Sequence, residues 1–248
     1  MSNTRGIVQL TRGESLSCGD LKQAAFTLRN GGIAIVPSDT CYALAALPFL
    51  RNSMICIVSV LPGKVAEPIP LVFGSIPLVE RYVKLTLGDE RLIDRYWPGP
   101  LTLVCEINGA HEKHQLQDML HTAGTIGVRH SDSLVERQLS DHLQRPITTC
   151  AIRYDSGEPV RTFDDALSIV RARMQEAKNR SALFSISLGH IPYQDISTVA
   201  AVQRAVFPSD MSRDPDDSVF VFRNGAIEPK DLKRTVRELS ASDWIDWT

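Results

Sequence analysis

The chain has 248 residues, of which 43% are hydrophobic and 23% are charged, and its formal net charge at pH 7 is −2. This length suits a single hydrophobic core, and the composition excludes a disordered, collagen-like or disulfide-rich protein. The apolar runs are too short to cross a bilayer, and so small a net charge leaves nucleic-acid binding to a local patch.

The chain has five cysteines, at positions scattered singly along the sequence. An odd number without a Cys-x-x-Cys pair argues against a disulfide scaffold and against a cysteine metal site. No basic start followed by an apolar block is present, so we expect no secretory signal and a cytoplasmic protein without membrane contact.

The first predicted helix begins near Ser17, because Asp20 stands three residues further on in the pattern of a capping box. An apolar stripe follows at helical spacing, and Gly31 and Gly32 supply a left-handed stop. The next segment, 33–36, is predicted as a buried strand that ends at Pro37.

Further segments are continuously or alternately apolar, which predicts strands over 70–73, 101–107, 125–129, 147–152, 183–188 and 219–222. Helical spacing predicts helices over 134–143 and 163–177, and the Pro-, Ser- and Asp-rich stretch 208–217 is predicted as a loop.

The order of these elements predicts a mixed α/β protein. Several strands follow one another without an intervening helix, which favours a mixed, twisted open sheet over a purely parallel one. We expect an N-terminal extension at 1–15, one domain at 16–238 and a C-terminal tail at 239–248.

The loop from Pro37 to Tyr42 is the first candidate for a binding site. It carries the hydroxyls of Ser38 and Thr40, the carboxylate of Asp39 and the phenol of Tyr42 directly after a strand, at an expected strand-to-helix junction. Backbone N–H groups point outward at such junctions, so the loop suits a polar ligand or a phosphate. The alternative is a capped turn with no ligand.

Arg129 is the first candidate for an anion ligand, since it ends an apolar strand. A guanidinium buried there without an anion would be costly, so Arg129 should face either a cleft or a carboxylate partner.

Two weaker patterns remain. His111, His114, His121 and Glu112 do not match known ligand spacings, so we expect no metal site from them. Near the C-terminus a basic stripe recurs at helical spacing, which is typical either of a solvated helix face or of a surface that binds the phosphates of RNA. Its members are Lys230, Lys233, Arg234 and Arg237.

Several of these segments together resemble one known family. The run from Gly31 to Leu44 resembles the opening strand and Pro-Thr-Asp-Thr-x-Tyr-Gly-Leu motif of the YrdC/Sua5/YciO family. Residues 97–102 resemble its Trp-Pro-Gly-Pro-Leu-Thr signature, and 126–129 resemble its Val-Gly-Val-Arg strand. The likeness runs in order over about residues 20–235, and ordered motifs are more specific than single ones.

This resemblance implies a twisted open sheet with a positively charged concave groove. It also implies a chemistry in which bicarbonate, L-threonine and ATP, with Mg²⁺, form threonylcarbamoyl-AMP for the t6A modification of tRNA. The residues that it places in the pocket are Ser38, Thr40, Tyr42 and Arg129.

The chain departs from the family pattern at charged and polar positions. Ser59 and Leu61 stand where active members carry a Lys-x-Arg pair, and Ala151 and Arg153 stand where they carry the Ser and Asn of Ser-Ala-Asn. Loss of such cations removes charge-assisted hydrogen bonds worth roughly 1.5–3 kcal/mol each. Lys64 and Arg153 are the nearby cations that could substitute.

Three functional hypotheses follow. The first is a divergent, YciO-like protein that keeps the groove and binds a nucleotide or L-threonine, or double-stranded RNA or tRNA, without the synthase residues. The second is an active threonylcarbamoyl-AMP synthase whose cations are Lys64, Arg129 and Arg153. The third is an accessory protein that receives a carbamoyl or acyl intermediate from a partner enzyme.

Overall fold

The structure is a computed structural model, and it describes residues 7–61, 69–109, 121–122, 124–202 and 219–237. Within these residues, twelve strands form one mixed sheet, whose main path runs β1-β10-β2-β3-β9-β4-β8-β6-β11-β12, with β5 paired to β6 and β7 to β8. The strands are β1 (Ile7–Leu10), β2 (Ile33–Pro37), β3 (Tyr42–Ala46), β4 (Leu71–Val72), β5 (Val83–Lys84), β6 (Leu101–Ile107), β7 (His121–Thr122), β8 (Thr125–Arg129), β9 (Ile147–Ala151), β10 (Leu183–Leu188), β11 (Thr198–Val202) and β12 (Val219–Arg223). The helices are α1 (Cys18–Arg29), α2 (Arg51–Val60), α3 (Ile76–Tyr82), α4 (Leu87–Tyr96), α6 (Leu134–Leu143), α7 (Phe163–Glu176) and α8 (Pro229–Arg237).

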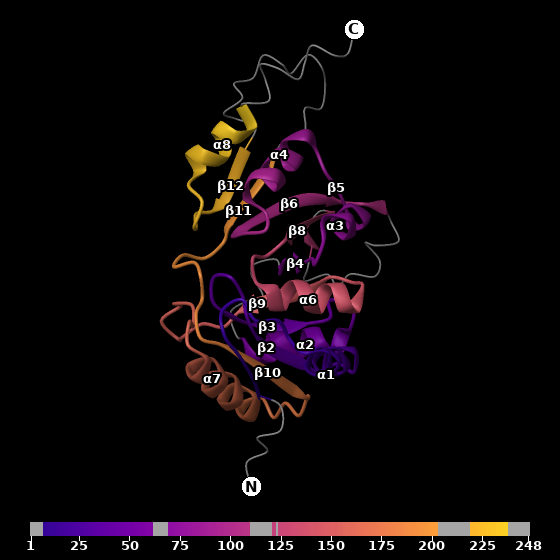
Figure 1. The fold of residues 1–248 in the computed structure, drawn as a ribbon, viewed down its shortest axis with the longest axis vertical. Coiled ribbons are helices and arrows are strands. Elements are labelled where there is room, and N and C mark those ends of the chain that lie inside the picture. Colours follow the sequence, from indigo (N-terminus) through magenta and orange to yellow (C-terminus); the bar gives the residue numbers. More distant parts are fainter. Residues whose placement is uncertain (1–6, 62–68, 110–120, 123, 203–218, 238–248) are drawn as a thin grey trace.

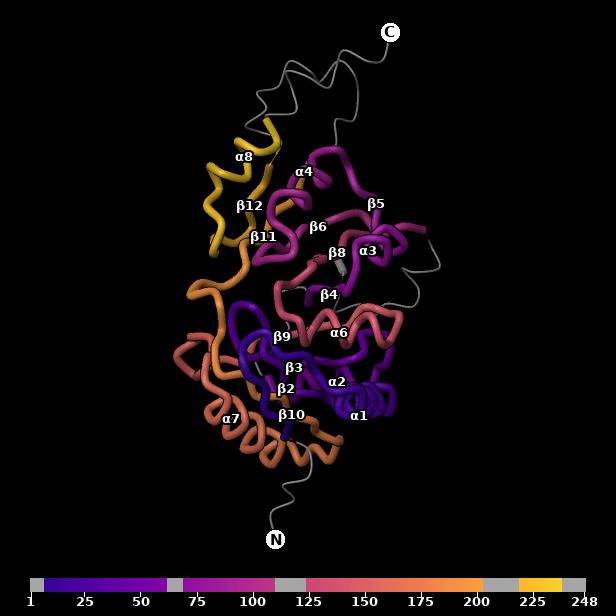
Figure 2. Tube along the Cα trace, in the orientation of Figure 1, coloured from indigo at the N-terminus to yellow at the C-terminus, as the bar shows by residue number. Residues whose placement is uncertain are grey.

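The sheet brings distant parts of the chain together. β10 lies between β1 and β2, parallel to both, whereas β2, β3 and β9 pair antiparallel. Figure 2 shows β9, β3, β2 and β10 next to one another, although they come from distant parts of the chain. Both kinds of pairing occur in one sheet, so the predicted mixed α/β sheet is confirmed.

One half of the sheet, around β2 and β3, is covered on both faces (Figure 1). Ile33 and Ile35 join a core with residues of α2 and α7, and Ala34 and Val36 join a second core with residues of α1 and α6. Side chains alternate across a strand, so a segment covered on both faces is apolar throughout.

The other half of the sheet packs its core on one face only. In β6, Leu101 and Leu103 join the core that also contains Leu92 of α4 and Leu232 of α8. Thr102 points to the opposite face, where its hydroxyl lies 3.3 Å from the Ser197 hydroxyl. The candidate site lies on this opposite face, next to β8 and β9.

Most predicted elements are confirmed, including the helix that starts after Ser17. The Ser17 hydroxyl accepts the backbone N–H of Asp20 at 3.1 Å, as expected for an N-cap. The strand-to-helix junction expected after Pro37 is wrong. The chain turns between β2 and the antiparallel β3, with Ser38 N–H donating to the Cys41 carbonyl at 2.9 Å.

Among the described residues, no helix is both long and apolar enough to cross a membrane. The predicted loop at 208–217 lies outside the described residues.

A candidate anion-binding site lined by arginines

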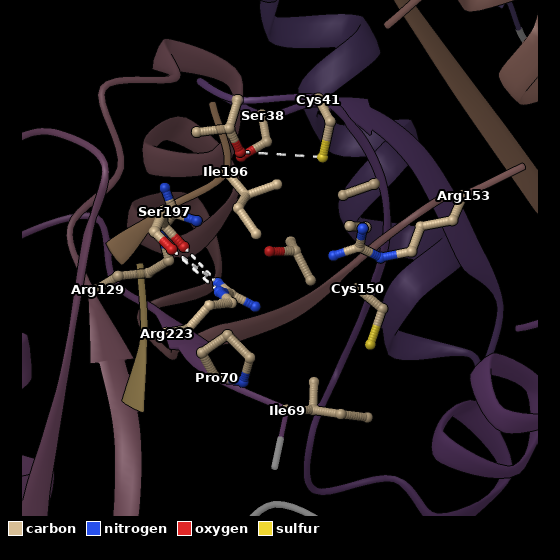
Figure 3. Close-up of a pocket in the computed structure, with 14 residues that line it drawn as sticks. Ser38, Cys41, Ile69, Pro70, Arg129, Cys150, Arg153, Ile196, Ser197 and Arg223 are labelled. Carbon is tan, nitrogen blue, oxygen red and sulfur yellow. Dashed lines mark hydrogen bonds between the residues drawn. The ribbon is translucent and has the colours of Figure 1, made fainter. Parts of the chain in front are cut away.

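The turn after β2 opens into a solvent-open cleft, which we call the arginine cleft; its empty space, open solvent at the mouth included, is about 570 Å³. Residues from the ends of β2, β8, β9 and β12 meet here, together with the segment before β11. Its described lining residues are Ser38, Thr40, Cys41, Ala43, Ile69, Pro70, Arg129, Thr149, Cys150, Ala151, Arg153, Ile196, Ser197 and Arg223 (Figure 3). Three of them are arginines, and none is acidic.

Arg153 and Arg223 approach the cleft from opposite sides, with their guanidinium groups turned toward its middle (Figure 3). Arg153 donates to the Gly157 carbonyl at 2.7 Å, which holds it across the turn after β9. Arg223 donates to the Ser197 carbonyl from both Nε and Nη2, at 3.1 and 3.0 Å. In these hydrogen bonds the acceptors are backbone carbonyls, which fix the guanidinium groups in place.

Arg129 lies at the back of the cleft. It was predicted to face either a cleft or a carboxylate partner, and it does both. It lines the cleft, and its Nη2 makes an ion pair of 2.5 Å with Asp39 Oδ1. Both side chains are buried, Arg129 at 5% and Asp39 at 0% exposure. Burial acts to lower the pKa of Arg129, but the Asp39 and Glu136 carboxylates raise it above its ordinary value.

Glu136 of α6 completes a buried cluster with Asp39 and Arg129, and sequence reasoning gave it no role. It is fully buried, and its Oε2 accepts the Ser38 hydroxyl at 3.0 Å. Burial raises the pKa of Glu136 above 4.5, although the Arg129 charge acts in the opposite direction. The sequence did contain one sign of a buried role, because Glu136 lies beside the apolar residues of the predicted helix.

Ser38 and Thr40 line the cleft, whereas Tyr42 does not. The Tyr42 ring is buried in the core, and its hydroxyl donates to the Leu188 carbonyl at 2.7 Å and accepts the Leu188 N–H at 2.8 Å. The Tyr42 hydroxyl therefore spends its hydrogen bonds on the backbone of β10, and the side chain connects β3 to β10.

The two positions where the resemblance expects Lys and Arg lie away from the cleft. The Ser59 hydroxyl donates to the Cys56 carbonyl and accepts Asn179 Nδ2, and Leu61 is buried in the core. Ala151 and Arg153, by contrast, both line the cleft. Lys64 lies outside the described residues.

The basic stripe occupies α8, outside the arginine cleft. Lys230 and Arg234 form ion pairs with Glu228 and Asp231, at 2.6 and 3.0 Å. Exposed pairs of this kind contribute little to stability, so they leave the side chains available to other partners. The remaining members, Lys233 and Arg237, lie on the same helix.

Ser197 and Arg223 were given no role in the sequence analysis. They are far apart in the sequence, and only the pairing of β11 with β12 brings them together. The hydrogen bond of 2.9 Å from Arg223 Nη2 to the Ser197 hydroxyl makes them one unit of the cleft wall.

A family model and several known proteins match the chain. A family model named Sua5_yciO_yrdC, described as telomere recombination, matches residues 27–207. Threonylcarbamoyl-AMP synthase of Rattus norvegicus is 27% identical over 136 residues, which are 55% of this chain and 47% of the relative. The chain thus matches about half the length of that relative.

Solved structures share the fold at low identity. P. abyssi Sua5 complexed with L-threonine has a TM-score of 0.72 and 20% identity, covering 92% of this chain and 60% of that one. E. coli YciO has a TM-score of 0.70 and 18% identity, covering 91% and 98%. HypF in its phosphate- and nucleotide-bound form has a TM-score of 0.55 and 14% identity, covering 73% and 27%.

Proposed function

The chain belongs to the Sua5/YciO/YrdC family, and from this membership we propose that it binds a nucleotide such as ATP, together with a small amino acid such as L-threonine, in the arginine cleft. Solved relatives hold L-threonine in one case and a nucleotide in another, as their descriptions state.

The observation that carries this proposal is the charge of the cleft lining. Arg153 and Arg223 line it in front of Arg129, which is already paired with Asp39, and no acidic side chain is among its described lining residues. Guanidinium groups match phosphate and carboxylate oxygens in a fixed fork geometry, and hydrogen bonds between charged groups are the stronger ones. A triphosphate is the ligand that uses several such groups at once.

We propose further that the cleft binds without forming threonylcarbamoyl-AMP. The Lys-x-Arg positions hold Ser59 and Leu61, and neither lines the cleft. Ala151 offers only a methyl group, and Arg153 contributes a charge on a longer side chain. Adenylate formation needs cations held at the reacting phosphate, and small displacements of such groups cost large factors in rate.

A protein-bound Mg²⁺ does not fit the cleft. No group of three or more His, Cys, Asp or Glu side chains in the described part of the chain could hold a metal ion. Asp39, the carboxylate in the loop from Pro37 to Tyr42, is already paired with Arg129. We propose that Mg²⁺ enters the cleft bound to the phosphates of ATP.

The test is to measure ATP and L-threonine binding by isothermal titration calorimetry, and then threonylcarbamoyl-AMP formation from ATP, L-threonine and bicarbonate. We expect binding without product, next to an active family member as positive control. Product formation at the rate of that control would establish the competing hypothesis, an active synthase that uses Lys64, Arg129 and Arg153.

A second candidate is binding of double-stranded RNA or tRNA by α8. The observation in its favour is that four basic side chains recur along one helix of nine residues. Two of them already have acidic partners, which weakens the positive field of the helix. The salt dependence of binding tests this candidate independently of the cleft.

A further inference from the structure

Ser38 joins the arginine cleft to the buried cluster behind it. Its side chain lines the cleft, and its hydroxyl donates toward two buried carboxylates, Glu136 Oε2 at 3.0 Å and Asp39 Oδ1 at 3.2 Å. A serine hydroxyl has one proton and two lone pairs. The proton is therefore donated to the carboxylates behind the cleft wall, and the hydroxyl faces the cleft with its lone pairs.

Glu136 is the nearer of the two acceptors, and it is the less occupied one. Asp39 Oδ1 already accepts Arg129 at 2.5 Å, and Asp39 Oδ2 accepts the Asp132 N–H at 3.1 Å. In Glu136, by contrast, Oε1 has no hydrogen-bond partner within the described part of the chain. A fully buried carboxyl with one unpartnered oxygen is costly, so its packing alone does not explain its presence.

The orientation of Ser38 decides which ligand group can lie against it. A hydroxyl that presents only a lone pair accepts a hydrogen bond from an N–H, and it offers nothing to a phosphate or carboxylate oxygen. The anionic part of a ligand is then left to Arg153 and Arg223 across the cleft. A molecule with an amino group at one end and an anion at the other satisfies both sides.

We propose that Glu136 is a positioning residue, which accepts the hydrogen bond of the Ser38 hydroxyl so that the cleft selects an α-amino acid through its amino group. The inference rests on the proposed function, because it names the group by which the cleft recognises its smaller ligand. Glu136 itself touches no ligand and acts through Ser38.

The experiment compares L-threonine with 3-hydroxybutyrate, which is the same molecule without the amino group. In the wild type we expect L-threonine to bind about 10- to 100-fold more tightly, because the analogue has no N–H to donate and leaves the Ser38 acceptor unpaired. In Glu136→Leu the Ser38 hydroxyl loses its nearer acceptor and can turn toward the ligand. The ratio of the two affinities should fall to about threefold or less, while ATP affinity changes by less than about twofold, since Arg153 and Arg223 are unaltered.

Three further variants give the experiment its controls. Glu136→Gln keeps an acceptor oxygen and should restore the ratio to within about threefold of the wild type. Ser38→Ala removes the acceptor itself and should abolish the selectivity. Asp141→Asn removes an exposed carboxylate from the same helix and should change nothing. If Glu136→Leu lowers the melting temperature by more than about 5 °C, Glu136→Met replaces it, because an unbranched side chain adapts to the site.

The outcomes separate the two proposals. A wild-type ratio retained in a folded Glu136→Leu variant overturns the role of Glu136 and leaves the proposed function intact. Equal weakening of ATP and L-threonine would make Glu136 a general structural residue and also overturns the inference. If the wild type binds neither ATP nor L-threonine, the proposed function fails and the inference falls with it.

Discussion

Arg129 and Asp39 form a buried ion pair whose two charged atoms are 2.5 Å apart. The pair connects β8 to the turn after β2, so it fixes the position of the loop that lines the cleft. Removing Asp39 takes away the hydrogen-bonded partner of the buried Arg129 guanidinium and leaves Glu136 as its neighbouring carboxylate, which compensates its burial only in part.

The first prediction concerns the stability of this pair. Asp39→Ala should lower the free energy of unfolding by about 3–5 kcal/mol, because the Arg129 charge remains buried. Urea unfolding measures the difference. The matched control is Asp155→Ala, which breaks the Arg173–Asp155 pair of 2.8 Å, where the Asp155 side chain is fully exposed. That change should cost about 1 kcal/mol or less. Equal effects at the two sites would contradict the special role of the buried pair.

The second prediction concerns the nucleotide. Arg153→Ala and Arg223→Ala should each weaken ATP binding about 10- to 100-fold, because each removes a charge-assisted hydrogen bond to phosphate. Calorimetry measures the affinity, with thermal unfolding to confirm that each variant is folded. Arg171→Ala removes an exposed arginine of α7 and should leave the affinity within about twofold. A comparable loss in that control would mean that general charge, and not the cleft, attracts ATP.

The third prediction concerns pH. Burial raises the pKa of Glu136 in the folded protein above its ordinary 4.5. The folded state therefore holds the proton more tightly than the unfolded state, and the stability from this site is present at low pH and lost as pH rises through the folded pKa. Glu136→Gln cannot titrate, so its free energy of unfolding should rise relative to the wild type from pH 4.5 upward. Urea unfolding of both proteins from about pH 4.5 to about pH 8 tests this. A constant difference across that range would contradict the buried carboxyl.

The fourth prediction concerns RNA. Reversing the charges of Lys233, Arg234 and Arg237 to Glu should weaken binding of double-stranded RNA. It should also reduce the slope of log affinity against log salt by about 3, because each basic side chain that binds a phosphate accounts for about one unit of the slope. The control is the double reversal of Lys22 and Arg29 on the exposed side of α1. An unchanged slope in the α8 variant would remove that helix from the RNA surface.

Local patterns predicted much of the fold. The strand over residues 101–107 and the helix over 134–143 have the predicted bounds, because each has a clear apolar period and turn residues at its ends. β3 was not predicted, since the run from Tyr42 to Ala46 consists mainly of small apolar residues that suit a helix as well as a strand. Its conformation is set by pairing with β2 and β9, which is information that a local window does not contain.

The candidate site was predicted less completely, and the reason is the same. Ser38, Thr40, Arg129 and Arg153 were identified near strand ends, and all four line the cleft. Tyr42 shares the loop motif, but strand alternation turns its ring into the core. The other residues of the site were assigned no role from the sequence: Glu136, Ser197 and Arg223. The residues that they contact in the site are far away along the chain, so no local pattern connects them.

The last prediction concerns Gly225, which lies against the backbone of the Ile196–Thr198 segment. Ser197 of this segment accepts the hydrogen bonds that orient Arg223. A Cβ atom at this position would stand 2.2 Å from the Ile196 carbonyl oxygen and 2.6 Å from the Thr198 backbone nitrogen. Both are main-chain atoms, so no side-chain rotation relieves the clash. The Ile196–Thr198 segment would have to move away from the cleft wall.

Gly225→Ala should therefore reduce stability by about 1–3 kcal/mol, the range for overpacking. Because Arg223 is bonded to Ser197, ATP affinity should fall in the same variant, although no ligand-binding side chain is changed. Gly189→Ala is the matched control, since apart from the adjoining residues no atom in the described part of the chain lies within 4 Å of the added Cβ. We expect Gly189→Ala to change the stability by about 0.5 kcal/mol or less. If Gly225→Ala binds ATP as the wild type does despite lower stability, then the position of the Ser197 segment is not what holds Arg223 in its binding orientation.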